Sequence, residues 1–234
     1  MAYHIHIAGC SPRSGTTLMH QMMISSYHFD EYSTHERGIK KGKRADSERV
    51  CTKKPTDMRY ARCVLASNPE VYFIYVVRDP RDVICSRLPR KGNGYYTNLR
   101  VWRDSEQKAV RLRGHPRFIE VKYEDLVHDP ASVQHELEQR MPFLERKADF
   151  ARFPEDWAGD PVAEQAMNGV RAPDPGSVGR WREHIPRVSR QVATHGSITP
   201  ELAARGYEAD ASWEAELESA EAGSESVLPE RIQL

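Results

Sequence analysis

The segment "IHIAGCSPRSGTTLMHQMM", residues 5–23, predicts a strand, a glycine-containing turn and a helix in direct succession. The strand is predicted over residues 3–8, and apolar residues at helical spacing predict the helix over residues 16–26. In such a unit the backbone N–H groups of the turn and of the first helical residues converge and can hold an anion. The segment therefore predicts a phosphate-binding loop over residues 9–17.

This loop differs from the one that binds nucleoside triphosphates, whose pattern is G-x-x-x-x-G-K-[ST]. Gly9 and Gly15 are separated by five residues instead of four, and Thr16 stands where the lysine is expected. The basic residue is Arg13, inside the loop. Because the lysine and its neighbouring hydroxyl divide the phosphates and Mg²⁺ between them, the sequence argues against ATP or GTP with Mg²⁺.

The rest of the chain alternates between strand and helix patterns. Residues 71–77, "VYFIYVV", predict a buried strand, and shorter strands are predicted over residues 29–32, 50–53 and 118–121. Helices are predicted over residues 57–67 (capped by Thr56 or Asp57), 81–88, 99–113, 130–140, 188–195 and 201–204, and loops over residues 89–98 and 160–179. This order predicts an α/β fold with a central, mostly parallel sheet flanked by helices, whose ligands bind at the carboxyl ends of the strands.

Composition narrows the class of protein. The chain has 234 residues, of which 39% are apolar and 29% charged, values ordinary for one globular α/β domain. It has no run of about 18 apolar residues and no secretory leader at its start, so we expect no membrane span and a cytoplasmic location. Its four cysteines form no C-x-x-C pair and its histidines show no ligand spacing, so we expect free thiols and no metal site.

Charge is balanced overall but unevenly distributed. The 34 basic and 34 acidic residues cancel, which argues against a nucleic-acid-binding domain. A basic zone follows the phosphate loop and comprises Arg37, Lys40, Lys41, Lys43, Arg44, Arg49, Lys53, Lys54, Arg59 and Arg62. This zone suggests an anionic ligand, although a solvated charged surface would give the same pattern. The last residues, 211–234, are acidic and predict a loose or helical tail after a domain spanning residues 1–210.

The loop "GCSPRSGTT" resembles the 5′-phosphosulfate loop of the sulfotransferase family, whose pattern is P-[KR]-S-G-[ST]-[ST]. The resemblance implies a P-loop-like three-layer fold, 3′-phosphoadenosine 5′-phosphosulfate as the donor, and no metal. It assigns donor binding to the loop residues Pro12, Arg13, Ser14, Gly15, Thr16 and Thr17. Arg13 takes the place of the family's loop lysine and would grip phosphate and sulfuryl oxygens bidentately.

The same resemblance implies a second site, for the 3′-phosphate of the donor. The family places an arginine at the end of a buried strand and a serine eight residues later. In "VYFIYVVRDPRDVICSR" these positions hold Arg78 and Ser86. Without the first loop, Arg78 could simply pair with Asp79 or Asp82.

Two later segments also resemble the family. In "FIEVKYEDLVHDP", Tyr123 matches a tyrosine that contacts adenine, although it could also be a tyrosine at the edge of the core. "GSVGRWREHI" resembles the loop that folds over the 3′-phosphate and implies contacts from Ser177 and Gly179. The family's R-K-G is absent there, because Asp174-Pro175-Gly176 precedes, so we expect Arg171 or Arg180 to supply the missing charge.

The catalytic groups are harder to assign, because different branches of the family carry the base at different positions. "VCTKKP" resembles a strand that ends in a catalytic lysine, which we assign to Lys53, with Lys54 as the alternative. One branch has a histidine as base where this chain has Pro55, and another has a glutamate where it has Thr52. A third uses a glutamate after the first helix, where "YSTHERG" offers Glu36 and His35. We expect Glu36 to be the general base in preference to His35, with Arg13 and Lys53 completing the catalytic set.

The sequence thus predicts an enzyme that moves a sulfuryl group to a hydroxyl or amine of a small-molecule or glycan acceptor. Two other functions stay open: a small-molecule kinase that uses ATP and Mg²⁺, and a non-catalytic member that binds a nucleotide or a partner. We expect the acceptor pocket to be built by residues 27–49, 89–102 and 151–171, loops of the kind that carry specificity. Aromatic walls are predicted from Tyr95, Tyr96, Trp102 and Trp157. The sequence defines neither the acceptor nor the oligomeric state.

Overall fold

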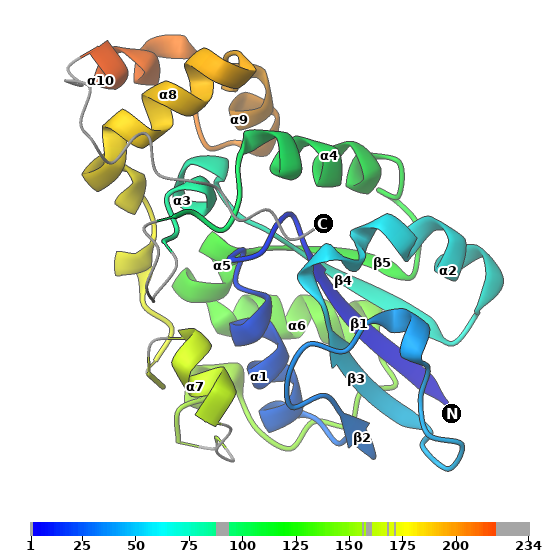
Figure 1. The fold of residues 1–234 in the computed structure, drawn as a ribbon. Coiled ribbons are helices and arrows are strands. Elements are labelled where there is room, and N and C mark those ends of the chain that lie inside the picture. Colours follow the sequence, from blue (N-terminus) through cyan, green and yellow to red (C-terminus); the bar gives the residue numbers. More distant parts are fainter. Residues whose placement is uncertain are drawn as a thin grey trace.

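A parallel sheet with the strand order β2-β3-β1-β4-β5 forms the centre of the molecule (Figure 1). The structure is a computed structural model that describes residues 2–87, 94–155, 157, 161–167, 169–170 and 172–218. The strands are β1 (Tyr3–Gly9), β2 (Glu31–Tyr32), β3 (Arg49–Lys53), β4 (Val71–Val77) and β5 (Phe118–Lys122). All four neighbouring pairs run parallel, as the strand and helix alternation predicts.

The helices connect these strands and lie on both faces of the sheet. The α-helices are α1 (Thr16–Ser26), α2 (Ala61–Ser67), α3 (Pro80–Ile84), α4 (Leu99–Val110), α5 (Tyr123–His128), α6 (Pro130–Arg140), α7 (Pro161–Met167), α8 (Ile185–His195), α9 (Thr199–Arg205) and α10 (Ala215–Glu218). The 3₁₀ helices are η1 (Ile39–Lys41), η2 (Pro55–Tyr60), η3 (Phe150–Arg152), η4 (Pro175–Ser177), η5 (Arg180–His184) and η6 (Ala211–Glu214). Two helical layers therefore enclose one sheet, which is the predicted three-layer α/β fold.

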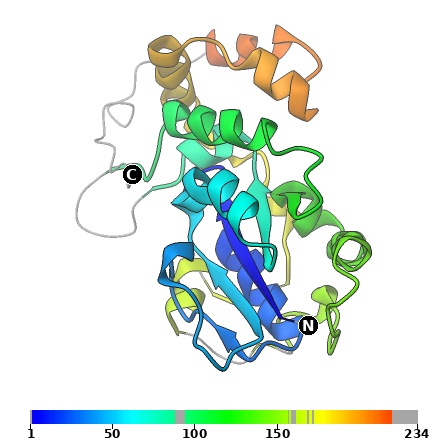
Figure 2. The same cartoon turned by 90° about the vertical axis from the view of Figure 1, so that its right-hand side faces the viewer.

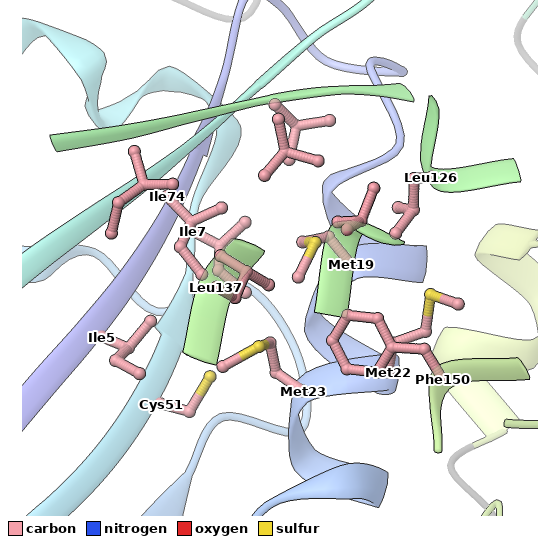
Figure 3. Packing of buried hydrophobic residues seen from close by; sticks show 14 of the residues in the cluster. Ile5, Ile7, Met19, Met22, Met23, Cys51, Ile74, Leu126, Leu137 and Phe150 are labelled. Carbon is pink, nitrogen blue, oxygen red and sulfur yellow. The ribbon is translucent and has the colours of Figure 1, made fainter. Parts of the chain in front are cut away.

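The largest apolar core lies between the sheet and helices α1, α5 and α6. Figure 3 shows Ile5, Ile7 and Ile74 from the sheet packed near Met19 and Met23 from α1. These side chains are at most about 1% exposed, so the methionines of the first helix serve as core packing. Burying this face fixes α1 against β1 and so fixes the position of the loop between them.

Two further cores cover the opposite face and one end of the sheet. Phe73, Tyr75 and Trp102 belong to the cluster under α2 and α4. A separate cluster holds Trp181 and Trp213 among residues of α3, α4, α8 and α9. Figures 1 and 2 show α8, α9 and α10 stacked together beyond α4. Residues 211–218 are therefore packed helical structure, while residues 219–234 of the predicted tail lie outside the described residues.

Several predicted helices start or end at other residues, and two of these differences affect site residues or their neighbours. The helix expected from residue 57 begins as the 3₁₀ helix η2, and α2 starts only at Ala61, without a side-chain cap. Asp57 accepts a hydrogen bond from the backbone N–H of Ile39 at 2.7 Å, so this carboxylate is not a helix cap. The helix predicted over residues 81–88 is the shorter α3, which ends at Ile84. Ser86 therefore follows the helix instead of lying within it.

A third correction concerns the segment predicted as a loop over residues 160–179. It contains α7 and the 3₁₀ helix η4. Proline at the first position of α7 is compatible with a helix start, because its missing N–H would have no partner in the first turn. Residues 160, 168 and 171 of this segment lie outside the described residues.

Three histidines are buried in the sheet and the first helix. His4 and His6 on β1 both contact the hydroxyl of Thr52, at 2.6 and 2.8 Å, and Nε2 of His6 lies 3.4 Å from Asp57. Burial lowers the pKa of His4 and of His20 to about 3, and it also lowers the pKa of His6. All three imidazoles are therefore neutral at physiological pH.

The sequence analysis also expects free thiols and no membrane span. Cys10, Cys51 and Cys85 are buried and Cys63 is exposed, and all four thiols are free. Burial raises the pKa of the three buried thiols. Over the described part of the chain, every helix is too short or too polar to cross a membrane.

Candidate functional site

A cavity of about 660 Å³ opens at the carboxyl ends of β1, β3 and β4. The structure brings most of the predicted site residues to its walls: Pro12, Arg13, Gly15, Thr16, Thr17, His35, Glu36, Lys53, Arg78, Ser86, Tyr123 and Ser177. Ser14 is instead buried within the loop, and Gly179, in the loop over residues 174–181, does not line the cavity. Residues from six separate segments of the chain thus meet at one place.

Two glycines allow the first loop to adopt its shape. Gly15 has φ +99°, and a Cβ there would lie 2.3 Å from Cδ2 of Tyr123. A Cβ on Gly9 would lie 2.2 Å from Oγ of Ser14. Either side chain would push the loop away from its neighbours. Gly15 also caps α1 without a side chain, so the first N–H groups of the helix are left for an anion.

Arg13 connects the two predicted phosphate sites. Its own φ is +74°, an uncommon conformation for a residue with a side chain. Its Nε donates to Oγ of Ser86 at 3.0 Å, and its guanidinium lies 5.2 Å from the ring centre of Tyr96. Its carbonyl oxygen accepts a hydrogen bond from Arg78 at 3.5 Å. Arg13, Ser86 and Arg78 therefore form one continuous polar wall.

Arg78 directly follows β4 and is held by the loop over residues 174–181. Its Nη2 donates to the carbonyl oxygen of Ser177 at 2.7 Å and lies 3.6 Å from Oδ2 of Asp82. Its Nε is buried and lacks a hydrogen-bond partner among the described residues. The alternative pairing expected for Arg78 thus occurs with Asp82, whereas the carboxylate of Asp79 binds Arg81. A buried donor without an acceptor is costly, and an anion in the cavity could satisfy it.

Tyr123 lies between the two arginine-bearing segments. Its ring stacks under the guanidinium of Arg78 at 4.2 Å and packs against Gly15. Its hydroxyl is 2.8 Å from Oγ of Ser177. The ring is 9% exposed and faces the cavity, so it is both a core-edge residue and a wall of the site.

The loop over residues 174–181 is held by Asp82, which the sequence analysis considered only as a partner of Arg78. The two carboxylate oxygens of Asp82 accept hydrogen bonds from the backbone N–H groups of Gly179 and Trp181, each at 2.9 Å. The carboxylate of Asp174 accepts from the N–H of Gly176 at 2.8 Å, although Asp174 also lines the cavity. The spacing of Asp82, four residues after Arg78, indicates their ion pair but not the contacts of Asp82 with this loop.

Arg180 supplies a further cation at the edge of the cavity. It lines the cavity and forms an ion pair with Glu183, with Nη2 and Oε2 3.1 Å apart. It is one of the two arginines expected to replace the family's R-K-G. The other, Arg171, lies outside the described residues.

The side of the cavity next to β3 holds the predicted catalytic groups. Nζ of Lys53 donates to Oγ1 of Thr17 at 2.9 Å, and Lys53 is 6% exposed. Lys53 lines the cavity, whereas Lys54 does not. Glu36 and His35 are exposed and also line it. This places a lysine, a loop hydroxyl and a carboxylate around one space.

His20 and Gln21 on α1 also line the cavity, and the sequence analysis missed both. Oε1 of Gln21 accepts a hydrogen bond from Nε1 of Trp157 at 2.9 Å. Oγ of Ser33 lies 3.4 Å from Nε2 of His20. Their spacing from Thr17, three and four residues along the helix, puts them on the face that follows the loop and could have indicated them.

Most of the predicted aromatic walls are wrong. Of the four aromatic residues, Tyr96 is the one found on the cavity. Tyr95 is buried under the guanidinium of Arg187, at 4.0 Å. Trp102 is buried in the core and donates to the carbonyl oxygen of Arg78 at 3.1 Å. Trp157 packs on the core next to Gln21. Residues 88–93 of the predicted acceptor loop lie outside the described residues.

The basic zone after the loop contributes little charge to the site. Arg37 and Arg44 both pair with Glu31, and Arg49 pairs with Asp30 and Glu145. Lys53 is the member of this zone that lines the cavity. The zone therefore lies mainly outside the cavity, and the lysine and arginine side chains that line the cavity are those of Arg13, Lys53, Arg78, Arg87 and Arg180.

The strand order, the loop after β1 and the two arginine sites define a P-loop-like α/β protein. A family model described as the sulfotransferase family matches residues 37–141. The chain resembles in fold the sulfotransferase domain of the Synechococcus PCC 7002 olefin synthase, at 20% identity and a TM-score of 0.51, over 78% of this chain and 87% of that one. The family model and the shared fold both support the resemblance to the sulfotransferase family that the loop motif indicates.

Weaker structural matches were also found. A sulfotransferase domain from the curacin biosynthetic pathway matches at 16% identity and a TM-score of 0.48, over 96% of this chain and 94% of that one. Retinol dehydratase in complex with androsterone and the inactive cofactor PAP matches at 11% identity and a TM-score of 0.45, over 77% and 75%. A search of curated protein sequences found no match.

Proposed function

We propose that this protein transfers a sulfuryl group from 3′-phosphoadenosine 5′-phosphosulfate to a hydroxyl or amine of a small-molecule or glycan acceptor. The observation that carries the proposal is the pair of arginines Arg13 and Arg78, joined through the hydrogen bonds of the cavity wall. Two arginine sites on neighbouring strand ends suit a nucleotide with separate 3′ and 5′ anions. A linear triphosphate would need the loop lysine, and Thr16 occupies that position.

The first site would hold the 5′-phosphosulfate. Arg13 and the N–H groups at the start of α1 offer several donors to one anion, and the hydroxyls of Thr16 and Thr17 add to them. Burial lowers the pKa of Arg13, but an arginine stays protonated at physiological pH. The loop therefore presents a fixed positive charge at the position of the phosphosulfate.

The second site would hold the 3′-phosphate and the adenine. The orphaned Nε of Arg78 and the hydroxyl of Ser86 fit a phosphate group at the end of β4. Tyr123 would stack near the base, and Ser177 with the Gly179 segment would cover it. Arg78 would exchange its contact with the carbonyl oxygen of Ser177 for the phosphate.

The reaction is an in-line displacement in which an acceptor oxygen or nitrogen bonds to sulfur while the bond from sulfur to the 5′-phosphate oxygen breaks. The donor supplies an activated sulfuryl group when it is bound. Arg13 and Lys53 stabilise the negative charge that develops on the sulfuryl and leaving oxygens. Glu36 takes the proton of the acceptor, and Lys53 keeps the hydroxyl of Thr17 oriented.

Donor identity is tested by thermal unfolding with adenosine 3′,5′-bisphosphate (PAP) and with ATP, each with Mg²⁺ and with EDTA. A ligand at 100 times its Kd stabilises the native state by about 2.7 kcal/mol, so a clear rise in Tm is expected with PAP. The rise should be the same in EDTA. Stabilisation by ATP with Mg²⁺ but not by PAP would overturn the proposal and favour a kinase.

Glu36→Gln is expected to lower kcat about 10²-fold or more, because a general base contributes on the order of 10²–10⁴ to the rate. The KM for the donor should change little, since Glu36 adjoins Arg37, whose N–H donates to the carbonyl oxygen of Lys53 at the end of β3, and the donor's anions are assigned to Arg13 and Arg78. His35→Gln is the matched control and should keep most of the turnover. Full activity in Glu36→Gln, measured with labelled donor, would remove Glu36 from this role.

A further inference from the structure

We propose that Glu124 and Tyr207 are positioning residues that set the affinity for the nucleotide part of the donor. This inference rests on the proposed function. Neither residue lines the cavity. Each acts through a neighbour that does, because Glu124 directly follows Tyr123 on α5 and contacts Asp79, which directly follows Arg78 just after the end of β4.

One carboxylate joins three segments of the chain. Oε1 of Glu124 accepts the backbone N–H of Asp79 at 2.9 Å. Oε2 of Glu124 accepts the hydroxyl of Tyr207 at 3.0 Å. Glu124 thus connects the end of β4 to the start of α5 and to the segment after α9. Because the two cavity residues Arg78 and Tyr123 precede these anchor points, their separation depends on this bridge.

The bridge lies in a largely buried environment that makes its loss costly. Asp79 is 5% exposed, and burial raises the pKa of the Glu124 carboxyl. Burial, together with the charge of Glu124, also raises the pKa of Tyr207, so the phenol keeps its proton and acts as the donor. Removing Glu124 leaves the N–H of Asp79 without an acceptor at a buried strand end. The strand end and α5 would then lose their fixed relation.

The segment around Tyr207 is held in place by other contacts. Arg205 pairs with Glu106 and Glu120. Nζ of Lys122 donates to the carbonyl oxygen of Arg205 at 2.6 Å. Glu208 pairs with Arg81 at 2.6 Å. Loss of the Tyr207 hydroxyl alone would therefore leave the segment docked and remove one contact to Glu124.

Loss of the Glu124 bridge would change the relative position of Arg78 and Tyr123, which stack on each other in the cavity. The guanidinium of Arg78 lies 4.2 Å over the ring of Tyr123. A 3′-phosphate held by Arg78 and an adenine next to Tyr123 must match this spacing. A change in the relation of β4 to α5 would therefore weaken the donor more than the acceptor.

The variants Glu124→Ala, Glu124→Gln and Tyr207→Phe test the inference through the Kd for PAP and the KM values for donor and acceptor. Glu124→Ala should weaken PAP binding about tenfold, the order expected for an unsatisfied buried N–H. Glu124→Gln should restore most of the affinity, because its amide oxygen can accept from Asp79. Tyr207→Phe should weaken PAP about threefold. In all three variants the acceptor KM should stay close to that of the wild type.

Tyr27→Phe is the matched control, because its hydroxyl also donates to a glutamate, Glu138, at 3.1 Å, far from Asp79 in the sequence and outside the cavity. It should lower the Tm without changing the Kd for PAP. If all three folded variants bound PAP as tightly as the wild type, the inference would be wrong while the proposed function would stand. The same holds if Tyr27→Phe weakened PAP binding as much as Tyr207→Phe did. Absence of PAP binding by the wild-type protein would overturn the proposed function and this inference with it.

Discussion

Arg13→Ala is expected to lower kcat/KM about 10³-fold, the order found when a donor aimed at developing negative charge is removed from an active site. Arg13 lines the cavity at the start of α1, and its Nε reaches Ser86, so the variant loses charge at the first site and a link to the second. The Kd for PAP should also rise, because PAP retains the 5′-phosphate. Initial rates with labelled donor and calorimetric titration with PAP measure the two effects.

Arg13→Lys separates charge from geometry. A lysine restores the positive charge but not the bidentate fork, so we expect partial recovery of the rate. Arg59→Ala is the control, because the guanidinium of Arg59 lies over Tyr60 and outside the cavity. It should keep wild-type turnover. If folded Arg13→Ala turned over at the wild-type rate, the phosphosulfate would have to bind elsewhere.

Through His4 and His20 alone, the free energy of unfolding is expected to fall by about 4 kcal/mol between pH 7 and pH 5, because each neutral buried histidine contributes up to about 1.4 kcal/mol per pH unit. The pKa values of His4 and His20 are lowered to about 3, and that of His6 is also lowered. The unfolded chain, with ordinary histidines near pH 6.5, binds more protons than the folded one. Stability is therefore full above pH 6.5, falls as the pH drops below it, and stops falling for these groups near pH 3.

Urea unfolding at a series of pH values measures this change. Replacing one of these two histidines, as in His4→Gln, should reduce the difference between pH 7 and pH 5 by about 2 kcal/mol. His135, an exposed residue on α6, provides the control, and His135→Gln should leave the difference unchanged. Asp57 has a lowered pKa beside His6, so its contribution is lost only at lower pH. A free energy of unfolding that stays constant from pH 7 to pH 5 would contradict the prediction.

Sequence patterns were sufficient to predict the bounds of helices and strands where a single periodicity dominates the segment. The predicted helix over residues 16–26 and the strand over residues 71–77 have the bounds of α1 and β4, because the strand is a continuous apolar run and the helix carries apolar residues at helical spacing. Helix boundaries near proline were less predictable. Pro55 starts a 3₁₀ helix before α2, and local propensity does not separate these two geometries. Helix α7 was missed because the surrounding glycines and prolines outweighed its short run of helix-forming residues.

In the site, too, residues within local motifs were predictable and residues that act through long-range contacts were not. Arg13, Arg78 and Tyr123 follow strands in recognisable motifs, so the sequence predicted that they would meet at one edge of the sheet. Asp82, Glu124 and Tyr207 bind partners that lie far away along the chain, and no local pattern encodes such contacts. Trp102 shows the opposite error, because its aromatic character suits a pocket wall and a buried core equally well.

The direct pairing of β1 with β4 fixes the distance between the loop of Arg13 and the position of Arg78. Gly9, which begins the loop of Arg13, is paired with Val76, two residues before Arg78. Neighbouring strands are about 4.8 Å apart, and this spacing cannot vary without breaking the hydrogen bonds of the sheet. For the proposed donor, backbone geometry and not flexible side chains therefore sets the distance between the sites for its two anions. Selection of a branched bisphosphate over a linear triphosphate would then survive changes in the acceptor loops, so that one scaffold could serve many acceptors.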